Sequence, residues 1–542
     1  MKRAIIGLWL CLAFCLMAET ASFKDDFSGY SMLSGGEPNW DIHSGKWEFI
    51  NGTARHTDVM FNGGLLFLKG KSFSDCNIKV RFKPEGNKRF VRAGGVVFRA
   101  RDCYNFYWIH YDCQHSKVFL AKRTTNRMWI PVAEKHNVPV TPDVWHTAEV
   151  SAVGPKITAK LDGQLVLEAE DKSFKEGRVG LRSGMGILNF DDFEVNGTPS
   201  DDGKFVMTYE AGEDVKTPRI QVPRVLSSVK GGYFPVMVHL GGQRLGAIVR
   251  ANAGHVGISG RLDWIHSEDG GKTWSKPTVL VDSKWDDRNP AAYVTRDGKV
   301  VVIYAEASTY DANGNFIREA GTYDLFLVES ADGGNTWSPK RPITFKDFAN
   351  NSVYGQGIIL NNGDILVPWY WKGGGFIRST DGGKTWQPPQ RIASCSEVAF
   401  VETAPNELLA IARSSDACHT SRSLDNGKTW SPLKKITVEG IHPATVIKLK
   451  NGKLLAAFGS RVRPYGIKVA ISGDNGETWP EKNMAFVSWD CGNTDCGYPS
   501  AAQLDDGSVA IISYAVGSPL HPFAIHSQCA ILSPEILDKL SK

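Results

Sequence analysis

One phrase of eight residues occurs five times in the second half of the chain. It follows the pattern S-x-D-x-G-x-T-W, as in SEDGGKTW and SLDNGKTW, and begins at Ser267, Ser330, Ser379, Ser423 and Ser472. Its aspartates are separated by 63, 49, 44 and 49 residues. Because about 50 residues make one four-stranded blade of a β-propeller, the repeat predicts a radial, all-β architecture for this part of the chain.

Each copy of the phrase has the chemistry of a tight turn. Gly and Asn adopt positive φ readily, and the Asp carboxylate can accept hydrogen bonds from amides of its own turn. The Ser and Thr hydroxyls can close the same loop, and the Trp can pack between neighbouring blades. We therefore expect these residues to be structural and to lie far from any chemistry.

The five phrases resemble the Asp boxes of the sialidase (neuraminidase) superfamily. The resemblance covers about residues 218–535 and implies a six-bladed β-propeller. We expect its blades near residues 218–275, 276–338, 339–387, 388–431, 432–480 and 481–535, the last without an Asp box.

Residues 1–21 are typical of a secretory signal peptide. A basic start at Lys2 and Arg3 precedes an apolar run and then small residues. The bulky Phe14 before Cys15 argues against a lipoprotein anchor. No later stretch reaches the roughly 18–20 apolar residues of a membrane span, and a net charge of +4 is too small to suggest a nucleic-acid partner. We therefore expect a secreted or periplasmic protein.

Residues 22–198 contain no Asp box but several alternating segments that predict strands, including 77–82, 94–100 and 146–151. Phrases such as FKDDF, KLDGQLV and NFDDFEV resemble concanavalin-A-like jelly-roll modules. The resemblance implies a β-sandwich with Phe27 and Phe193 on neighbouring strands, which either binds glycan or acts as a spacer. The polar residues 199–217 predict a linker that contributes a strand to close the ring, before the propeller of residues 218–542.

The cysteines and histidines give no metal signature. Cys103/Cys113 and Cys491/Cys496 are local candidates for disulfides. No second cysteine or histidine cluster stands beside either pair, and the other histidines are scattered, so we predict neither a metal site nor a cofactor.

The family resemblance implies a site with three parts: an arginine triad, a tyrosine nucleophile polarised by a glutamate, and an aspartate acid/base. Glu397 opens the segment SEVAFVETAPNELLAIAR, which ends at Arg413, and Tyr498 lies in CGYPSAAQLDDG. These positions imply that Glu397 accepts the proton of Tyr498 and that Arg413 binds a carboxylate. Glu402 is the alternative to Glu397.

Arg463 lies where the family has its third triad arginine, with Arg461 as the nearby competitor. A guanidinium suits this task because its planar fork pairs with both oxygens of a carboxylate.

The first blade departs from the family pattern. Tyr233-Phe234-Pro235 stands in place of Arg-Ile-Pro, and His255 stands at the position of the acid/base aspartate. Histidine can perform acid/base chemistry near neutral pH. Several arginines could refill the missing place; these are Arg219, Arg224, Arg250, Arg261 and Arg288. In the segment WDDRNPAAY, Asp287 and Arg288 either line the pocket or form a structural salt bridge.

These residues predict an exo-glycosidase that removes terminal acidic sugars, such as sialic acid, from glycans with retention. One alternative is a glycosidase or polysaccharide lyase that acts on a uronate-containing glycan with His255 as acid/base. Another is a non-catalytic propeller that binds glycan through exposed aromatic residues; the candidates are Trp264, Trp285, Tyr354, Trp369, Tyr370 and Trp371.

Overall fold

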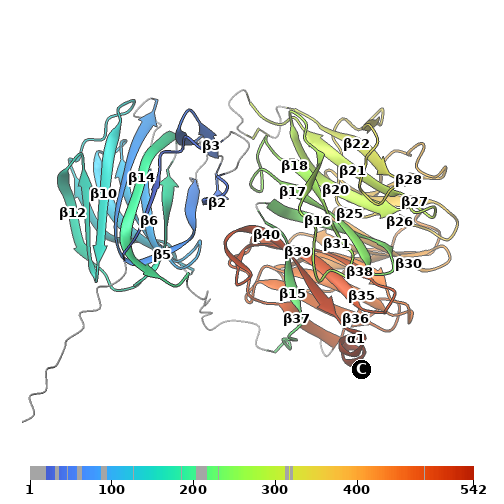
Figure 1. Cartoon of the computed structure of the whole chain (residues 1–542). Coiled ribbons are helices and arrows are strands. Elements are labelled where there is room, and N and C mark those ends of the chain that lie inside the picture. The colour runs from blue at the N-terminus through green and yellow to red at the C-terminus, as the bar shows by residue number, and fades with distance from the viewer. Residues whose placement is uncertain are drawn as a thin grey trace, which may run out of the picture.

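The structure is a computed structural model. It describes residues 20–30, 36–45, 47–57, 64–86, 94–125, 127–184, 186–202, 216–229, 231–311, 316–317, 321–480 and 483–541. Figure 1 shows two units built from strands, side by side, and one short helix, α1 (Pro534–Leu540), near the C-terminus. The predicted all-β class is therefore confirmed. Almost all of the predicted signal peptide and most of the predicted linker lie outside the described residues.

The N-terminal unit is a β-sandwich of fourteen strands. They are β1 (Ala21–Asp25), β2 (Trp40–Ser44), β3 (Trp47–Ile50), β4 (Thr53–His56), β5 (Leu65–Glu85), β6 (Gly94–Ala100), β7 (Phe106–Asp112), β8 (Lys117–Thr124), β9 (Arg127–His136), β10 (His146–Val153), β11 (Lys156–Leu161), β12 (Gln164–Glu170), β13 (Gly177–Ser183) and β14 (Ile187–Ser200). The strand segments predicted in this unit are confirmed.

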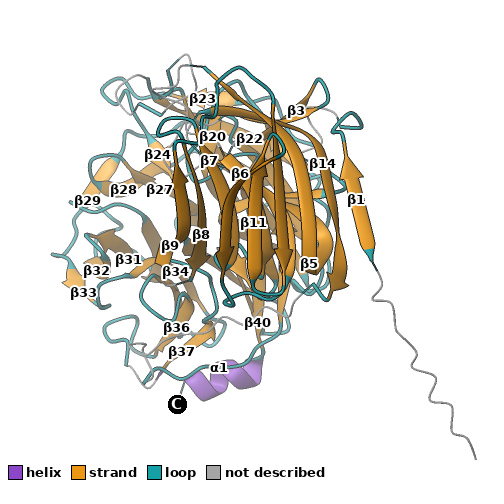
Figure 2. Cartoon of the chain, turned by 90° about the vertical axis from the view of Figure 1, so that its left-hand side faces the viewer, coloured by secondary structure: helices purple, strands orange, loops and turns teal. Residues whose placement is uncertain are grey.

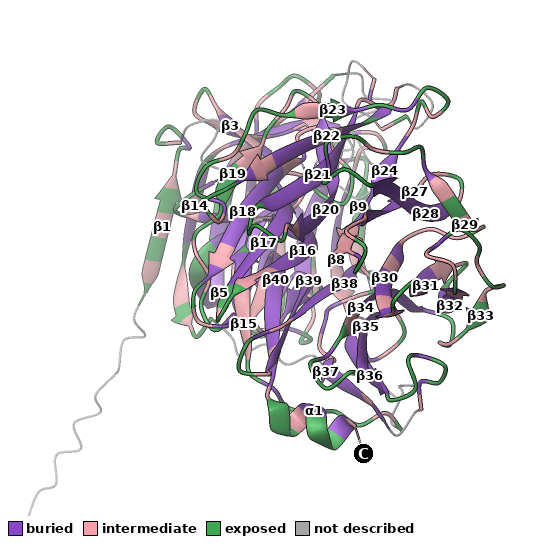
Figure 3. Ribbon diagram, turned by 90° about the vertical axis from the view of Figure 1, so that its right-hand side faces the viewer, coloured by how far each residue is buried: buried purple, intermediate pink, exposed green. Residues whose placement is uncertain are grey.

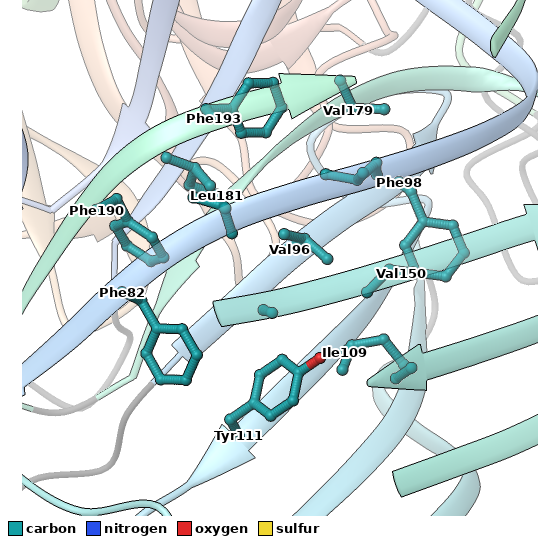
Figure 4. Packing of buried hydrophobic residues seen from close by; sticks show 14 of the residues in the cluster. Phe82, Val96, Phe98, Ile109, Tyr111, Val150, Val179, Leu181, Phe190 and Phe193 are labelled. Carbon is teal, nitrogen blue, oxygen red and sulfur yellow. The ribbon is translucent and has the colours of Figure 1, made fainter. Parts of the chain in front are cut away.

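The long strand β5 belongs to both layers of the sandwich. Its first residues pair with β2 and β13, and its last residues pair with β10 and β14. Apolar side chains from both layers, among them Phe82, Tyr111 and Phe193, fill the space between them (Figure 4). Strand β1 runs beside β14 at the edge of the sandwich (Figure 2), with Asp25 opposite Phe193. Phe27 lies two residues after the end of β1 and outside any strand, so the prediction that it lies on a strand beside that of Phe193 is wrong.

The C-terminal unit contains the remaining strands. They are β15 (Arg224–Val229), β16 (Gly231–Gly241), β17 (Arg244–Ala251), β18 (Arg261–Ser267), β19 (Thr278–Val281), β20 (Asp286–Val294), β21 (Val300–Ala307), β22 (Tyr323–Ser330), β23 (Arg341–Ile343), β24 (Ser352–Val353), β25 (Gly355–Gln356), β26 (Ile358–Ile359), β27 (Ile365–Tyr370), β28 (Gly374–Ser379), β29 (Gln390–Ala393), β30 (Val398–Ala404), β31 (Glu407–Ser414), β32 (Ala417–Ser423), β33 (Lys434–Lys435), β34 (Ile441–Lys448), β35 (Leu454–Ser460), β36 (Gly466–Ser472), β37 (Met484–Ser488), β38 (Cys496–Gln503), β39 (Val509–Ser518) and β40 (His521–Leu532).

These strands form sheets that follow one another along the chain and are antiparallel apart from the parallel pairs β20–β25 and β32–β34. The sheets comprise β16–β19, β20–β23 with β25, β24 with β26–β29, β30–β37, and β38–β40 with β15. A single parallel pair, Ala417 with Ile441, joins β30–β33 to β34–β37. The first strands of successive sheets contact one another, as β16 does with β20 and β38. Figure 3 shows these strands buried and the outer turns exposed.

The strand that joins the two ends of this unit differs from the prediction. Strand β15 pairs with β40 of the last sheet, with Arg224 opposite Ala530. Residues 224–229 therefore complete the last sheet, although the spacing of the Asp boxes assigns them to the first repeat. The closing strand was predicted within residues 199–217. It lies after them, at residues 224–229.

The five Asp boxes have one common hydrogen-bond pattern, as their turn chemistry predicts. In each box the Ser hydroxyl donates to the Asp carboxylate at 2.6–2.8 Å and accepts from the amide of the second Gly position at 2.7–2.8 Å. The Thr amide donates to the same carboxylate at 2.9–3.0 Å. Box tryptophans pack against the preceding sheet, as Trp337 does against Trp264 and Trp430 against Phe376. The boxes are therefore structural.

The two predicted disulfide candidates have different outcomes. Cys103 and Cys113 flank β7, whose seven residues span about 23 Å at 3.3 Å per residue, so this prediction is wrong. Cys491 and Cys496 are buried free thiols, and the hydrogen bond between them raises the pKa of Cys491. Cys491 and Cys496 thus lie next to each other but form no disulfide.

The two units meet where the β39–β40 hairpin packs against the sandwich. The ring of Phe523 lies 5.0 Å from Phe67, and the guanidinium of Arg178 lies 4.0 Å from the centre of the Phe523 ring. The Tyr104 hydroxyl donates to the carbonyl of Val516. Since Tyr104 and Phe67 are almost fully buried, this contact has an apolar centre.

A single Asp box can be tested by substitution. Hydrogen bonds from Thr385 and Ser379 lower the pKa of Asp381 below its ordinary value of 3.8. The folded state therefore favours the ionised form, which stabilises the protein above about pH 4 and less as the pH falls. We expect Asp381→Ala to lower the melting temperature at pH 7, and the difference from the native protein to shrink in acid.

The matched control is Asp347→Ala, which removes an exposed carboxylate for which the described residues offer no hydrogen bond. Calorimetric scans from pH 7 to pH 3 provide the measurement. An Asp381 difference that stayed constant across this range would show that the carboxylate charge does not stabilise the turn.

Candidate active site

The first strands of three sheets, and the first strand of the β34–β37 half of the eight-stranded sheet, are interrupted at the same place. Register shifts interrupt β16 between Tyr233 and Val236, β20 between Arg288 and Ala291, β34 between Ile441 and Ala444, and β38 between Gly497 and Ser500. Each interruption contains a proline, which cannot donate a ladder hydrogen bond. Such bulges change the direction in which a side chain points, and here they lie where the sheets converge.

The residues before three of these prolines have left-handed backbone conformations. Phe234, Asn289 and Tyr498 have φ values of 51°, 53° and 48°. This conformation is strained for residues with a Cβ, at a cost of about 1–3 kcal/mol each, and such strain concentrates at functional sites. The ring of Phe234 lies 4.9 Å from that of Tyr498, so two of the strained residues are in contact.

Tyr498 and Glu397, both predicted as site residues, lie in direct contact. The Tyr498 hydroxyl donates to Oε1 of Glu397 at 2.7 Å, although 101 residues separate them in sequence. Ser396 donates to the other carboxylate oxygen at 2.6 Å, and Nη1 of Arg413 lies 3.5 Å from Oε1. Glu402, the alternative, accepts a hydrogen bond from the Asn361 amide on an exposed turn, away from Tyr498.

The electrostatics of this pair keep the proton on the phenol. Burial, followed by the charge of Glu397, raises the pKa of Tyr498 well above its ordinary value. Burial alone would raise the pKa of Glu397, but the charge of Arg413 and hydrogen bonds from Ser396 and Tyr498 lower it overall. Tyr498 is therefore a neutral donor and Glu397 an ionised acceptor at neutral pH.

His255 belongs to a second pair, with Asp495. Its Nδ1 lies 3.2 Å from Oδ1 of Asp495, and the ring is 46% exposed, so its other nitrogen can reach a ligand. Tyr514 and Tyr233 donate to the same carboxylate at 2.7 and 3.3 Å. Burial would raise the pKa of Asp495, but the hydrogen bond and charge of His255 and the hydrogen bond of Tyr514 lower it. Asp495 therefore orients His255 as an ionised carboxylate.

A buried ion cluster holds the loop that carries His255. Asp286 is fully buried and accepts from Arg250 at 2.6 Å, from Arg288 at 3.2 Å and from the Tyr310 hydroxyl at 2.6 Å. Arg250 also donates to the carbonyls of Gly254 and Gly257. Because these carbonyls flank His255, the cluster determines where the loop lies.

Two arginines face the Tyr498–Glu397 pair. Arg413 contacts Glu397, and the guanidinium of Arg461 lies 5.4 Å from the centre of the Tyr498 ring. Nε and Nη2 of Arg461 are buried, and among the described residues neither has a hydrogen-bond partner. Burial lowers the pKa of Arg461, but Tyr514, Tyr498 and Asp495 raise it overall, so the guanidinium is charged. An unmatched buried cation is suited to an anionic ligand.

Other predicted site residues lie elsewhere. The Arg463 guanidinium lies 5.9 Å from the Tyr465 ring. Arg261 pairs with Asp263 at 2.9 Å. Asp287 accepts from the amide and hydroxyl of Ser283, and burial raises its pKa to about 7.

Several of the aromatic candidates for sugar stacking are not available for it. Trp264 and Trp369 are 2% and 0% exposed, and Tyr354 is also buried. The Tyr354 hydroxyl donates to the carbonyls of Pro235 and Tyr498, so this residue supports the strained strands. The stacking prediction is wrong for these three residues.

Sequence reasoning underestimated Asp495, Phe234 and Arg250. The recurring residue-proline pair in the first strands was a usable signal for Phe234, because Tyr498 occupies the corresponding place in the last sheet. Asp495 lies only three residues before Tyr498, yet its partner His255 is 240 residues away. Only the fold shows that the two form a pair.

The described part of the chain contains neither a candidate metal site nor a candidate membrane-spanning helix. No group of three or more His, Cys, Asp or Glu side chains there is arranged to hold a metal ion. No described helix has both the length and the apolar character to cross a membrane.

Two domain families match the chain. A BNR repeat-like domain matches residues 286–511, and a 3-keto-alpha-glucoside-1,2-lyase-like domain matches residues 23–196. A sialidase from Paraclostridium sordellii is 27% identical over 121 residues, which make up 19% of this chain and 29% of that relative. The match thus spans less than a third of the relative's length.

Solved structures resemble the chain in fold. A protein of unknown function from Dyadobacter fermentans aligns with a TM-score of 0.50 and 22% identity, over 58% of this chain and 98% of its own. A leech intramolecular trans-sialidase aligns with a TM-score of 0.47 and 15% identity, over 86% of this chain and 95% of its own. The two domain matches and the partial match to a sialidase confirm the predicted combination of a BNR, sialidase-like fold with an N-terminal jelly roll.

Proposed function

We propose that the protein is a glycoside hydrolase that removes terminal acidic sugars, of the sialic-acid kind, from glycans with retention of configuration. The observation that carries the proposal is the 2.7 Å hydrogen bond from the Tyr498 hydroxyl to Glu397. Sialidase similarity over part of the chain supports the hydrolase class. The substrate class rests on the unmatched guanidinium of Arg461 beside Tyr498.

The first half-reaction is a displacement by the phenol. Tyr498 Oη attacks the anomeric carbon while its proton passes to Glu397, and the bond to the leaving oxygen breaks. The protonated His255 ring gives its Nε2 proton to that oxygen, and the Asp495 carboxylate accepts the Nδ1–H hydrogen bond. The charge of Asp495 stabilises the imidazolium before transfer.

The second half-reaction reverses these roles. Neutral His255 takes a proton from water, whose oxygen attacks the anomeric carbon of the glycosyl–tyrosine. The Tyr498 oxygen leaves and regains its proton from Glu397. Two displacements at one carbon give net retention. Arg413 and Arg461 hold the sugar carboxylate throughout.

We further propose the surrounding organisation. Residues 1–21 form a signal peptide that directs the protein out of the cytoplasm, followed by a jelly roll over 22–198, a linker over 199–217 and a propeller over 218–542. The two four-stranded runs of the eight-stranded sheet count as separate blades, which makes six with the other four sheets. No further group is required for the proposed chemistry.

Tyr498→Phe tests the nucleophile. The substitution removes one oxygen, and we expect turnover of a fluorogenic sialoside to fall by roughly 10³-fold or more because no covalent intermediate can form. The matched control is Tyr293→Phe, which removes another buried phenol oxygen, from β20, and should leave the rate unchanged. The two classes predicted as alternatives give different results: ultraviolet-absorbing product from a uronate glycan would indicate a lyase, and binding without turnover would indicate a lectin.

Arg461→Met tests the assignment of the carboxylate-binding arginine. Loss of a buried charge pair with the ligand costs about 2 kcal/mol or more, so we expect kcat/KM for a sialoside to fall at least about tenfold, chiefly through KM. Arg463→Met is the matched control and should change kcat/KM less than about threefold. The reverse order of effects in steady-state kinetics would reassign the third arginine to Arg463.

Asp495→Asn tests the acid/base pair. Without its carboxylate, the His255 imidazolium loses the anion that stabilises and orients it, so less of the ring is ready to donate a proton. The kcat for glycosides with a poor leaving group should therefore fall about 10²-fold or more. Aryl glycosides whose leaving group is an acidic phenol need little protonation of the leaving oxygen, so their kcat should fall less than about tenfold. His255→Gln should give the same dependence on the leaving group. Equal losses for both substrates would mean that Asp495 only maintains the shape of the pocket.

A further inference from the structure

Two arginines of the jelly roll lie together without an acidic partner. Arg123 lies on β8 and Arg182 on β13. Burial is the larger cause, and the nearby charge of Arg123 the smaller, of a fall in the pKa of Arg182 to about 10. Within the described residues, no carboxylate lies within ion-pair distance of either guanidinium. Like charges held side by side destabilise a fold, so the pair requires a reason other than stability.

Strand alternation places both arginines on the outer face of the sandwich. Val118 and Leu120 of β8 and Val179 and Leu181 of β13 point into the sandwich core. Residues of opposite parity, which include Arg123 and Arg182, therefore point to the other face of the same layer. That face also carries Trp108 and Phe119, which belong to the hydrophobic cluster that continues into the C-terminal unit.

Aromatic rings lie beneath and beside the guanidinium groups. Arg182 lies 5.0 Å from the ring centre of Trp108, and Arg123 lies 4.9 Å from that of Tyr104. Trp129 packs against Trp108 at 5.2 Å and is 48% exposed.

Polar atoms of this face lack partners. Nε1 of Trp108 and Nε of Arg123 are buried, and neither has a hydrogen-bond partner among the described residues. Trp108 as a whole is only 1% exposed. Leaving such donors unsatisfied costs about 1–3 kcal/mol each, which a ligand with acceptor oxygens would recover.

The face adjoins the candidate active site through Tyr104. The Tyr104 ring packs against Gly492, where a Cβ would come within 2.1 Å of it. Gly492 belongs to the segment between Cys491 and Cys496, which also carries Asp495. A glycan that extends from the active site toward the jelly roll would therefore meet the two arginines.

We propose that Arg123, Arg182, Trp108 and Trp129 form a second carbohydrate site, which binds a carboxylated pyranose. The paired guanidinium groups bind the carboxylate, and the exposed indole of Trp129 offers an apolar surface to the C–H face of the sugar. The Trp108 and Arg123 N–H groups supply hydrogen bonds. The site does not depend on turnover, so it goes beyond the proposed hydrolase activity.

Titration calorimetry on the full chain with Tyr498→Phe, which prevents turnover, tests the proposal. The probes are trigalacturonate and 3′-sialyllactose, with lactose as the neutral control. We expect at least one acidic probe to bind and lactose to bind at least tenfold more weakly. Adding Arg123→Met and Arg182→Met should weaken binding of the acidic probe at least tenfold. Arg101→Met, which replaces an exposed arginine of the same unit, should leave that binding unchanged.

Arg461→Met in the same background separates the two sites. Binding that persists in Arg461→Met and is lost in the jelly-roll double variant supports the second site, even if the native protein hydrolyses no sialoside. Binding lost in Arg461→Met alone, no binding of either acidic probe, or equal binding by the double variant would overturn the proposal. Should the double variant fail to fold, Arg182→Lys keeps the charge without the planar fork and should weaken binding at least threefold.

Discussion

The candidate site depends on strained turns at the inner ends of the sheets. An uninterrupted strand would place successive side chains on alternate faces between neighbouring sheets. The bulge in β38 instead turns Tyr498 toward Glu397, at the cost of a left-handed backbone. Hydrogen bonds from Gln356 to the carbonyls of Met237 and Ala501, and from Thr445 to Gln356, connect four sheets beneath this place. The strained residue therefore rests on a rigid support.

Charge is arranged differently in the supporting layer and at the reacting centre. Beneath the His255 loop, one buried carboxylate, Asp286, is matched by Arg250 and Arg288. Beside Tyr498, Arg413 faces the Glu397 carboxylate at 3.5 Å, and Arg461 has two buried nitrogens without a partner in the described chain. Matched buried charges stabilise a defined geometry, whereas unmatched ones favour a bound counter-ion. Among the charges described in these two layers, the unmatched cation is the one beside Tyr498, where the proposed substrate carboxylate would bind.

Sequence reasoning could predict the parts of the molecule that depend on local chemistry. The Asp boxes form as their Asp, Gly, Ser and Thr residues imply, and the pairing of Tyr498 with Glu397 follows from family phrases. The choice between Arg461 and Arg463 could not be made, because both precede the same strand and only the path of the turn decides which one faces the ring. A ring-closing strand was predicted within residues 199–217, but its place at residues 224–229 and its pairing with β40 were missed, since no local signal marks a strand that pairs with the far end of the unit.

The two departures of the first blade from the family pattern are related by the structure. Tyr233, in the place of the first arginine, and His255, in the place of the acid/base aspartate, both contact the carboxylate of Asp495. An arginine at position 233 would compete with His255 for that carboxylate and would neutralise it. A tyrosine donates a hydrogen bond but leaves the negative charge in place, so Asp495 can stabilise a protonated histidine. Under the proposed function, the tyrosine in the first arginine's place and the histidine in the aspartate's place are therefore linked through one carboxylate, Asp495.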